Sequence, residues 1–454
     1  MFKASQYNFL IETTDNQLLL YNSRTSAFAA VPLEFSGDIR YLLTNPSRGT
    51  GKDEEIIGNL KAGGFLIKSD MDELGEIRKV YDDYKNGGKK VILTMLASEA
   101  CNFNCPYCFT YDKRGLSMAP WVYDAALEYL QKSVNTESQI KINWFGGEPT
   151  LAHDNILSFS NRLNQLASER KLKKPLYTMV TNGYLMTAGK FESYVEAGIN
   201  IFQITLDGPE PFHNKTRSLP DGRETFRTIW NNLMAIKSVK AKFEMSIRVN
   251  FLTDMRQEIY ALTDEFSSVF GADERFGIYF RPVYNFETKR QNICSMKDSI
   301  CSMAEGLQMQ LEYDLHAMDV LSKYRKKSTM PNPIPRAIPA WCETEKKSSW
   351  IVGADGLLFK CDTYIGQKEQ AAGRINKAGE IERFQSAYKW DTDIYSAGIE
   401  NCIKCKLLPL CQGGCPRLRM DGKKSCHLNE PYLKEILLKA YAAHMNPQLN
   451  MQNN

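Results

Sequence analysis

Three cysteines lie close together after an apolar stretch in the first quarter of the chain, with the spacing Cys101-x3-Cys105-x2-Cys108. Thiolates are the usual ligands of iron–sulfur clusters. Three of them on one short loop can hold three irons of a four-iron cubane, and the fourth iron then keeps an open position for chemistry. A zinc site that lacks one ligand, or a group of buried thiols, are the alternatives that this spacing alone leaves open.

Most of the other cysteines lie near the C-terminus. The chain has 12 cysteines, of which none precedes Cys101 and two are isolated, Cys294 and Cys301. The last seven are spaced as Cys342-x13-Gly356-x4-Cys361 and Cys402-x2-Cys405-x5-Cys411-x3-Cys415-x10-Cys426. Clustered thiols in a large chain without an export signal indicate metal ligands or redox groups rather than disulfides. Zinc ribbons also use C-x2-C pairs.

The elements that position the first three cysteines alternate between strands and helices over residues 91–325. Strands are expected at 91–96, 140–145, 176–181, 201–206, 243–249 and 276–283, with helices at 119–134, 153–171 and 223–237. Six such units predict a parallel sheet that forms a barrel or a partial barrel. Chemistry in these folds lies on the loops after the strands. Here those loops read EACNFNCPYC, GGEPT, TNG, LDGP and RVN.

These loop motifs resemble those of radical S-adenosylmethionine (SAM) enzymes. CNFNCPYCF matches the family's cluster motif, with an aromatic residue before the last cysteine, and GGEP resembles its SAM amino-group motif. TLDGPEPFHNKTR is similar to a stretch of the subgroup that includes sulfatase maturases and peptide maturases. The resemblance implies an α/β fold with a partial (β/α)6 TIM-like barrel, and a [4Fe–4S] cluster whose open iron chelates SAM.

The same resemblance implies roles for individual residues. Cys101, Cys105 and Cys108 would ligate the SAM-binding cluster. The SAM contacts would be Gly146, Gly147 and Glu148 to the amino group, Thr205 to polar atoms, and Arg217 to the carboxylate. A guanidinium suits a carboxylate, and glycines let the backbone approach a ligand closely. The family usually has serine at the position of Thr205, but threonine keeps the hydroxyl.

The C-terminal spacing closely resembles the seven-cysteine SPASM pattern, an extension that carries two auxiliary [4Fe–4S] clusters. The resemblance assigns Cys402, Cys405, Cys411 and Cys426 to a distal cluster, and Cys342, Cys361 and Cys415 to a proximal cluster. Sulfatase maturases have an extra cysteine shortly after the first of the seven, and this chain has none there. The second cluster therefore has an open iron or takes Cys294 or Cys301 as a ligand; buried thiols are the simpler interpretation of that pair.

Asp362 directly follows Cys361 and matches the position of a proposed catalytic Asp in sulfatase maturases. A carboxylate beside a cluster can accept a proton while a substrate radical is oxidised. A role in a turn or in hydrogen bonding around the ligands is the alternative. Among the five histidines, His213 lies in the SAM-contact stretch and His427 follows a ligand cysteine, and a structural role is expected for both.

Residues 1–90 contain no cysteine and are expected to form a winged-helix-like module. The pattern predicts a hairpin over 7–22, a strand at 65–67, and helices near 32–43, 53–62 and 70–86. Peptide maturases for ribosomal natural products often carry such a module, to which a leader peptide adds as a strand. A structural cap or a dimerisation module is the alternative. The predicted domains are a recognition module (1–90), a radical SAM core (91–325) and a SPASM domain (326–454).

Composition excludes several other classes of protein. The net charge of +4, without a basic block, gives no signal for nucleic acid. The N-terminal residues lack the apolar core of a signal peptide, and no apolar run is long enough to cross a membrane. We therefore expect a soluble, cytoplasmic protein.

Together these features predict a radical SAM oxidoreductase with SAM and three [4Fe–4S] clusters as cofactors. The expected substrate is a ribosomally synthesised precursor peptide, in which the enzyme links a cysteine sulfur to a carbon of another residue. A flavodoxin or ferredoxin is the expected electron donor. The alternatives are formylglycine formation in a sulfatase, a carbon–carbon crosslink, or an iron–sulfur scaffold or electron-transfer protein that merely retains the barrel.

Overall fold

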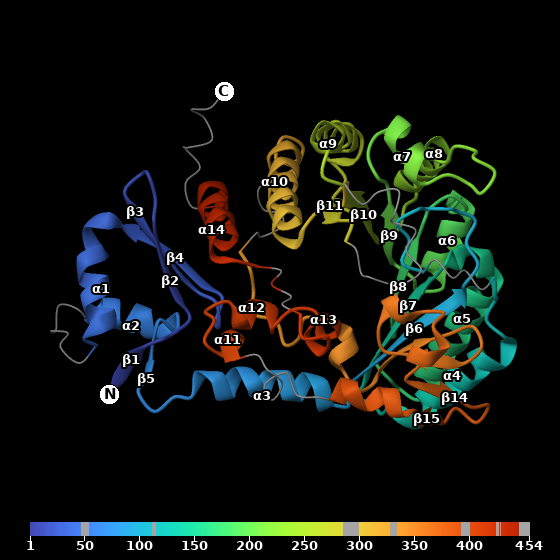
Figure 1. Ribbon diagram of the computed structural model, residues 1–454, viewed down its shortest axis with the longest axis horizontal. Coiled ribbons are helices and arrows are strands. Elements are labelled where there is room, and N and C mark those ends of the chain that lie inside the picture. Colours follow the sequence, from blue (N-terminus) through green and yellow to red (C-terminus); the bar gives the residue numbers. More distant parts are fainter. Residues whose placement is uncertain are drawn as a thin grey trace. The chain divides into compact units, whose positions relative to one another are not determined.

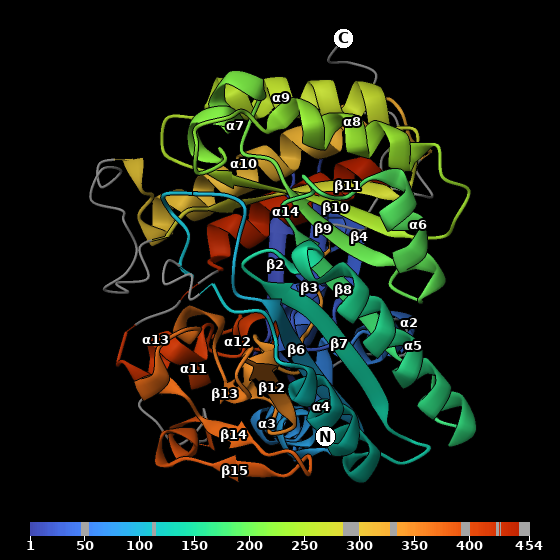
Figure 2. The same ribbon diagram turned by 90° about the vertical axis from the view of Figure 1, so that its right-hand side faces the viewer.

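Six parallel strands form the sheet that the sequence predicts (Figures 1 and 2). They lie side by side in chain order, which is the topology of consecutive βα units. The strands are β6 (Lys90–Ser98), β7 (Gln139–Gly146), β8 (Leu176–Thr181), β9 (Ile201–Thr205), β10 (Glu244–Phe251) and β11 (Phe276–Pro282). The expected α/β fold with a partial barrel is confirmed.

The computed structural model describes residues 1–46, 54–110, 115–284, 299–326, 334–391, 400–423, 426 and 428–444. The chain folds as two units. The barrel unit contains the described parts of Gly87–Met330 and Lys346–Asp391. The terminal unit contains those of Met1–Asn86, Pro331–Glu345 and Thr392–Asn454.

One face of the sheet is apolar and is covered by helices. On β10, for example, Met245, Ile247 and Val249 share one face and are fully buried. Apolar side chains of this face form one core with the helices that follow the strands (Figure 2). These helices are α4 (Pro120–Ser133), α5 (His153–Glu169), α6 (Ala188–Glu196), α7 (Glu210–Thr216), α8 (Phe226–Lys237) and α9 (Arg256–Phe270).

The opposite face of the sheet carries polar side chains, because successive residues of a strand point to opposite faces. The Asn143 side chain donates to the Thr94 hydroxyl at 3.1 Å and accepts from the Thr178 hydroxyl at 2.7 Å. Arg248 lies on the same face and pairs in register with Thr205. A polar sheet face suits a binding site better than it suits packing against another apolar layer.

Residues from beyond the predicted core extend this sheet at the β6 end. Strand β12 (Ser349–Val352) pairs in parallel with β6, and β13 (Leu357–Phe359), β14 (Gly373–Ile375) and β15 (Ile381–Arg383) follow in antiparallel order. Helix α10 (Met303–Leu321) packs against β11 and α9 at the other end. The barrel unit therefore includes residues on both sides of position 325.

The terminal unit contains the predicted hairpin, now seen as β2 (Asn8–Glu12) and β3 (Gln17–Asn22). A third strand, β4 (Ala27–Pro32), pairs with β3 on its other side and was not predicted. The expected strand at 65–67 is β5 (Leu66–Lys68), which pairs with β1 (Phe2–Ala4). The expected helices are α1 (Ser36–Thr44), α2 (Glu54–Ala62) and α3 (Glu73–Asn86).

The two faces of β3 bury different partners within the terminal unit. Leu18 and Leu20 pack with residues of α1 and α2. Leu19 and Tyr21 pack instead with the C-terminal helix α14 (Glu430–His444), where Leu433 is fully buried. The first and last segments of the chain thus share one apolar core. Within the described residues, no helix is both long and apolar enough to span a membrane.

Candidate active site

Cys101, Cys105 and Cys108 lie on the loop that leaves β6, and each side chain is partly exposed. The backbone N–H of Phe103 donates to Cys101 Sγ at 3.3 Å, and Cys108 Sγ lies 3.0 Å from the Thr110 hydroxyl. Burial raises the pKa of the Cys105 thiol to about 12. A metal that binds here must therefore displace a proton, as is usual for thiolate ligands.

Among the described residues, no three His, Cys, Asp or Glu side chains converge in a way that would hold a single metal ion. The ligands of a cubane cluster need not converge on a single metal ion, because each thiolate binds a different iron. Three cysteines on one loop fit that donor set. Their assignment as ligands stays a prediction.

Gly146 and Gly147, at the end of β7, lie directly against the backbone of the cysteine loop. The N–H of Gly147 donates to the Ser98 carbonyl, and that of Glu148 donates to the Ala100 carbonyl, each at 2.9 Å. A Cβ at Gly146 would lie 2.2 Å from the Ser98 oxygen, and one at Gly147 would lie 2.3 Å from the Ala100 oxygen. Only glycine at these two positions lets the backbones of the β6 and β7 loops approach closely enough for these hydrogen bonds, whatever else the residues contact.

The Glu148 carboxylate is fully buried and already bonded to two neighbouring loops. It accepts from the N–H and hydroxyl of Thr150 at 3.0 and 2.6 Å, at the start of the short 3-10 helix η3 (Pro149–Ala152). It also accepts from the Thr181 hydroxyl at 2.6 Å and the Asn182 N–H at 2.7 Å, after β8. The carboxylate thus ties the β7 and β8 loops together, beside the SAM contact that the sequence predicts for it.

Arg217 follows α7 and is 8% exposed. One Nη1–H donates to the Tyr107 hydroxyl at 2.9 Å, and the guanidinium lies 5.5 Å from the centre of the Phe103 ring. Its Nε is buried and has no partner among the described residues, and the same holds for Nδ2 of Asn102 in the cysteine loop. Buried donors without acceptors are costly, so the Arg217 guanidinium fits an anionic group such as the SAM carboxylate.

Three residues that sequence reasoning missed meet beside Arg217. Tyr107 and Asp207 come from the loops after β6 and β9, Asn250 comes from the end of β10, and their side chains are bonded to one another. Asp207 stands inside the LDG motif already noted, and Tyr107 is the aromatic residue before the third cysteine. These motifs indicated where Asp207 and Tyr107 stand in the chain, but not that their side chains contact each other.

Asp362 follows Cys361 after β13, within the barrel unit. The Cys361 thiol donates to Asp362 Oδ1 at 3.6 Å. Desolvation raises the pKa of the Asp362 carboxyl group, and the hydrogen bond with Cys361 and the charge of Arg248 on β10 oppose this effect. A catalytic role for Asp362 stays a prediction.

His213 is fully buried on α7. Burial, and then the charge of Arg217, lower its pKa well below the usual range, so the imidazole is neutral. Its Nδ1 accepts from the Asp207 N–H at 3.2 Å, and Nε2 lies 3.1 Å from the Thr225 hydroxyl. These bonds agree with the expected structural role; His427 lies outside the described residues.

Two of the predicted distal ligands lie on short helices of the terminal unit, Cys402 on α11 (Glu400–Ile403) and Cys411 at the end of α12 (Leu408–Cys411). The Cys405 N–H donates to the Cys402 carbonyl at 3.0 Å. Burial raises the pKa of the Cys411 thiol to about 12, and Cys405, Cys402 and Cys426 raise it further. The assignment of these four cysteines to one cluster stays a prediction.

The predicted proximal ligands belong to different units. Cys342 and Cys415 are in the terminal unit, and Cys361 is in the barrel unit. The Cys342 thiol donates to the Thr344 hydroxyl at 3.2 Å, and Cys361 Sγ lies 3.1 Å from the Thr363 hydroxyl. Cys301 is 5% exposed within the apolar core of the barrel unit, while Cys294 lies outside the described residues.

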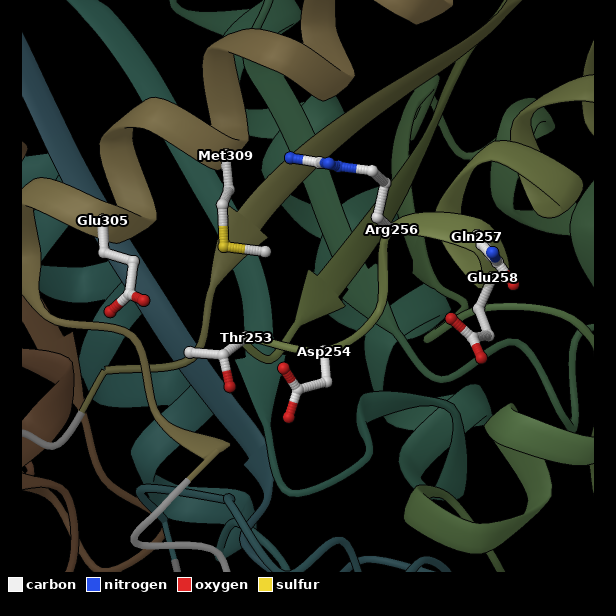
Figure 3. Close-up of a pocket in the computed structure, with 7 residues that line it drawn as sticks. All are labelled: Thr253, Asp254, Arg256, Gln257, Glu258, Glu305 and Met309. Carbon is white, nitrogen blue, oxygen red and sulfur yellow. The ribbon is translucent and has the colours of Figure 1, made fainter.

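A pocket of about 520 Å³ lies at the same edge of the sheet, where β10 leads into α9 and next to the first turns of α10 (Figure 3). Asp254, Glu258 and Glu305 line it, together with Arg256 and Met309. Glu305 completes the capping box of α10 with Ser302. The pocket shares the strand-end edge with the cysteine loop but contains none of the predicted site residues.

Comparison with known proteins agrees with this geometry. The Radical SAM superfamily model matches residues 95–259. The Cysteine-type anaerobic sulfatase-maturating enzyme of Clostridium perfringens is 25% identical over 372 residues, which cover 80% of this chain and 98% of that enzyme. The radical SAM cyclopropyl synthase TigE of Paramaledivibacter caminithermalis is 24% identical over 292 residues, covering 56% of this chain and 60% of that enzyme.

Among solved structures, native anSMEcpe with bound AdoMet and the Cp18Cys peptide has the same fold. Its TM-score is 0.51 at 22% identity, and the match covers 80% of this chain and 98% of that one. The fold, the loop motifs and these matches define a radical SAM enzyme, which uses SAM and a [4Fe–4S] cluster. This chain is such an enzyme, and it is related to the anaerobic sulfatase-maturating enzymes.

Proposed function

We propose that this enzyme modifies a ribosomally synthesised precursor peptide by joining a cysteine sulfur to a carbon of another residue. The observation that carries the proposal is the N-terminal module. The sulfatase-maturating relative is matched over 98% of its length but over only 80% of this chain. The remaining fifth is about the size of residues 1–86, so the chain has room for a function that this relative lacks.

The N-terminal module offers an edge strand to an extended peptide. β3 is the central strand of the sheet, so β2 and β4 are its edges. Residues Phe9 and Ile11 of β2 are buried, whereas the first five residues of β4 are half-buried and the last is exposed. An edge strand presents unpaired N–H and C=O groups to a further strand. We propose that the leader peptide pairs with β4.

The site supports hydrogen abstraction from a bound peptide. SAM, when reduced through the cluster, supplies a carbon radical that removes one hydrogen atom from the substrate. Arg217 holds the SAM carboxylate in this proposal, and the loops of β6, β7 and β9 surround the ligand. Thioether formation removes a second hydrogen, as a proton from the thiol and an electron from the closing C–S bond. An auxiliary cluster is the proposed acceptor of that electron.

The C-terminal cysteines support the choice of a thiol-containing substrate. Cys342 and Cys361 have no further cysteine between them, so the predicted proximal cluster has three ligands from the SPASM pattern. An iron with an open position can take a substrate thiolate, because thiolates are its usual ligands. Asp362, next to Cys361, is the proposed acceptor of the proton.

Formylglycine formation is the second candidate function. The sulfatase-maturating relatives act on sulfatases by their names. By the resemblance already described, Asp362 matches the position of a proposed catalytic Asp in those enzymes. In that case no leader peptide is needed, and residues 1–86 have another role. The two candidate functions therefore differ in whether the open edge of β4 binds a leader peptide.

A matched pair of proline variants on β4 tests the proposal. In an antiparallel pair, successive residues alternately face the partner strand and face away from it. One of Ala29 and Ala30 therefore donates to β3, and the other directs its N–H to the open edge. Proline removes that donor in each case. We expect both Ala29→Pro and Ala30→Pro to keep SAM cleavage without peptide.

Only the edge-facing variant should lose precursor binding while the module keeps its thermal stability. The other variant should lower the stability of the module instead. Full-rate precursor modification by both variants, with the module folded, would contradict leader recognition at β4. It would favour the sulfatase-type alternative.

A further inference from the structure

A buried carboxylate without an assigned role lies at the centre of the predicted SAM site. Asp207 directly follows β9 and Leu206, and it is 1% exposed. Its Oδ2 accepts from the hydroxyl of Tyr107 and, at 3.1 Å, from the hydroxyl of Thr216. Its Oδ1 accepts from the Asn250 amide at 3.2 Å. One side chain thus joins the cysteine loop, the end of α7 and the end of β10.

The backbone of Asp207 is tied to the same helix by a second route. Its N–H donates to His213 Nδ1 at 3.2 Å, so the proton of the neutral imidazole is on Nε2. That Nε2–H donates to the Thr225 hydroxyl at 3.1 Å, and Thr225 in turn donates to the Arg217 carbonyl at 2.5 Å. This chain of bonds fixes the main chain of Arg217.

The side chain of Arg217 is fixed through the other route. Its Nη1–H donates to the Tyr107 hydroxyl at 2.9 Å, and that hydroxyl donates to Asp207. The hydroxyl therefore stands between the guanidinium and the carboxylate, accepting from one and donating to the other. Arg217 Nε, which has no partner among the described residues, remains available to a ligand.

Loss of the carboxylate would disturb every part of this arrangement. A buried charge is tolerated only when hydrogen bonds or an opposite charge compensate it. Without Asp207, the Tyr107 hydroxyl loses the carboxylate acceptor that it has in the structure, and Arg217 loses the acidic group that orients it. Networks of this kind respond as a unit rather than bond by bond.

We propose that Asp207 is a positioning residue that, through the Tyr107 hydroxyl, orients Arg217 toward the carboxylate of SAM and holds the cysteine loop beside it. The proposal deepens the SAM site and rests on the assignment of Arg217 to the SAM carboxylate. It is independent of the peptide that the enzyme modifies.

A double-mutant cycle on the full-length, anaerobically reconstituted enzyme tests the proposal. SAM affinity is measured by equilibrium dialysis for Tyr107→Phe, Asp207→Asn and the double variant. Each single variant should weaken SAM binding about tenfold, the scale of one charge-assisted hydrogen bond. The double variant should also lose about tenfold rather than a hundredfold, because both changes break the same chain of bonds.

The electron paramagnetic resonance spectrum of the reduced cluster provides a second readout. In the parent enzyme, added SAM should shift the g-values of the site-differentiated cluster. In both single variants the shift should be smaller or heterogeneous at saturating SAM, while iron content per chain is unchanged. A residue that only stabilised the fold would leave this signature intact once the protein was folded.

Two matched controls separate positioning from general damage. Tyr177→Phe removes another buried hydroxyl of the barrel unit, which bonds to Asn164 at 2.9 Å among the outer helices. Asp273→Asn alters a carboxylate that pairs with Arg275 at 2.6 Å, just before β11. Both should keep SAM affinity and the SAM-induced g-shift.

Arg217→Ala distinguishes the two ways in which the proposal can fail. Unchanged SAM affinity in Arg217→Ala would overturn the assignment on which the proposal rests. Weakened binding in Arg217→Ala, with parental affinity in Tyr107→Phe and Asp207→Asn, would overturn the positioning role alone. Additive losses in the double variant would contradict the relay through Tyr107. Should Asp207→Asn not fold, Tyr107→Phe removes only a hydroxyl and decides the question through the spectrum.

Discussion

The two groups of cysteines are held in different ways. Cys101, Cys105 and Cys108 lie on a loop that is bonded to the β7 and α7 loops and to Asn250 of β10 by buried side chains and backbone groups. The cysteines of the terminal unit lie among the short helices α11 (Glu400–Ile403), α12 (Leu408–Cys411) and α13 (Pro416–Met420). Left-handed residues Gln412, Gly413 and Gly414 link the last two helices.

From this difference we expect the two regions to depend on metal to different extents for their fold. In the barrel unit, the protein's own network orders the cysteine loop, so a cluster would be added to an existing site. In the terminal unit, helices of four or five residues are too short to be stable by themselves. Metal binding commonly supplies the folding free energy of such segments. The predictions below follow from this contrast.

The largest effect should come from removing one group of cysteines at a time. Cys101→Ala/Cys105→Ala/Cys108→Ala should abolish SAM cleavage and leave the auxiliary irons and the terminal unit intact. Cys402→Ala/Cys405→Ala should lower the iron content and destabilise the terminal unit, with SAM binding retained. Iron analysis and 5′-deoxyadenosine formation measure both. Loss of all iron in the first variant would contradict the separation of the two groups.

Iron removal should act on the two regions unequally. After chelation, hydrogen exchange should become fast over residues 400–423, because the turns that carry the thiols lose their crosslink. The segment 98–108 should keep much of its protection through the bonds to Gly147 and Glu148. Equal loss of protection in both regions would show that the barrel loop is not preorganised.

Substitutions at Glu148 and Arg217 should differ most in their effect on the stability of the fold. Glu148→Ala removes the acceptor of four bonds, besides the SAM contact predicted for it, and should lower the unfolding free energy by about 3 kcal/mol. Arg217→Ala should weaken SAM binding by about 1.5–3 kcal/mol, with less effect on stability. Chemical denaturation and SAM titration distinguish the two. Unchanged stability in Glu148→Ala would contradict its role as a tie between loops.

A smaller effect is expected from Asp314 on α10. Desolvation raises the pKa of its carboxyl group to about 6, partly opposed by Arg281. Because the folded pKa lies above the unfolded value, this group stabilises the fold only at low pH, and the contribution is lost as pH rises through 6. Asp314→Asn should therefore gain about 1–2 kcal/mol at pH 8 and nothing at pH 4. Asp124→Asn, on an exposed ion pair, is the control; a gain that is independent of pH would contradict the prediction.

The sequence predicted the six strands well because each is a short apolar run followed by a helix with a regular apolar stripe. It did not predict that Ser349–Val352 pairs with β6, because pairing between distant segments leaves no local pattern. β4 was missed for a different reason: its AFAAVP sequence has small residues instead of strong strand formers.

In the candidate site too, the sequence indicated residues that belong to local motifs but not the contacts between distant segments. The motifs located the cysteines, the glycines and Arg217, since these residue types carry recognisable chemistry at fixed spacing. The contact of Tyr107 with Asp207 joins residues that are 100 positions apart. The sequence also could not show that Gly146 and Gly147 abut the cysteine loop, because only the folded backbone brings the two loops together.

The most direct test of the proposed function is product mass with a thiol count. A short cysteine-containing reading frame is first sought beside this gene. The peptide that it encodes is incubated with the reconstituted enzyme, SAM and a reductant, and is then alkylated. The account predicts a product that has lost two hydrogens and contains one thiol fewer that reacts with the alkylating agent. Loss of two hydrogens with every cysteine still alkylated would show a carbon–carbon link and contradict the thioether, and exchange of sulfur for oxygen would show formylglycine.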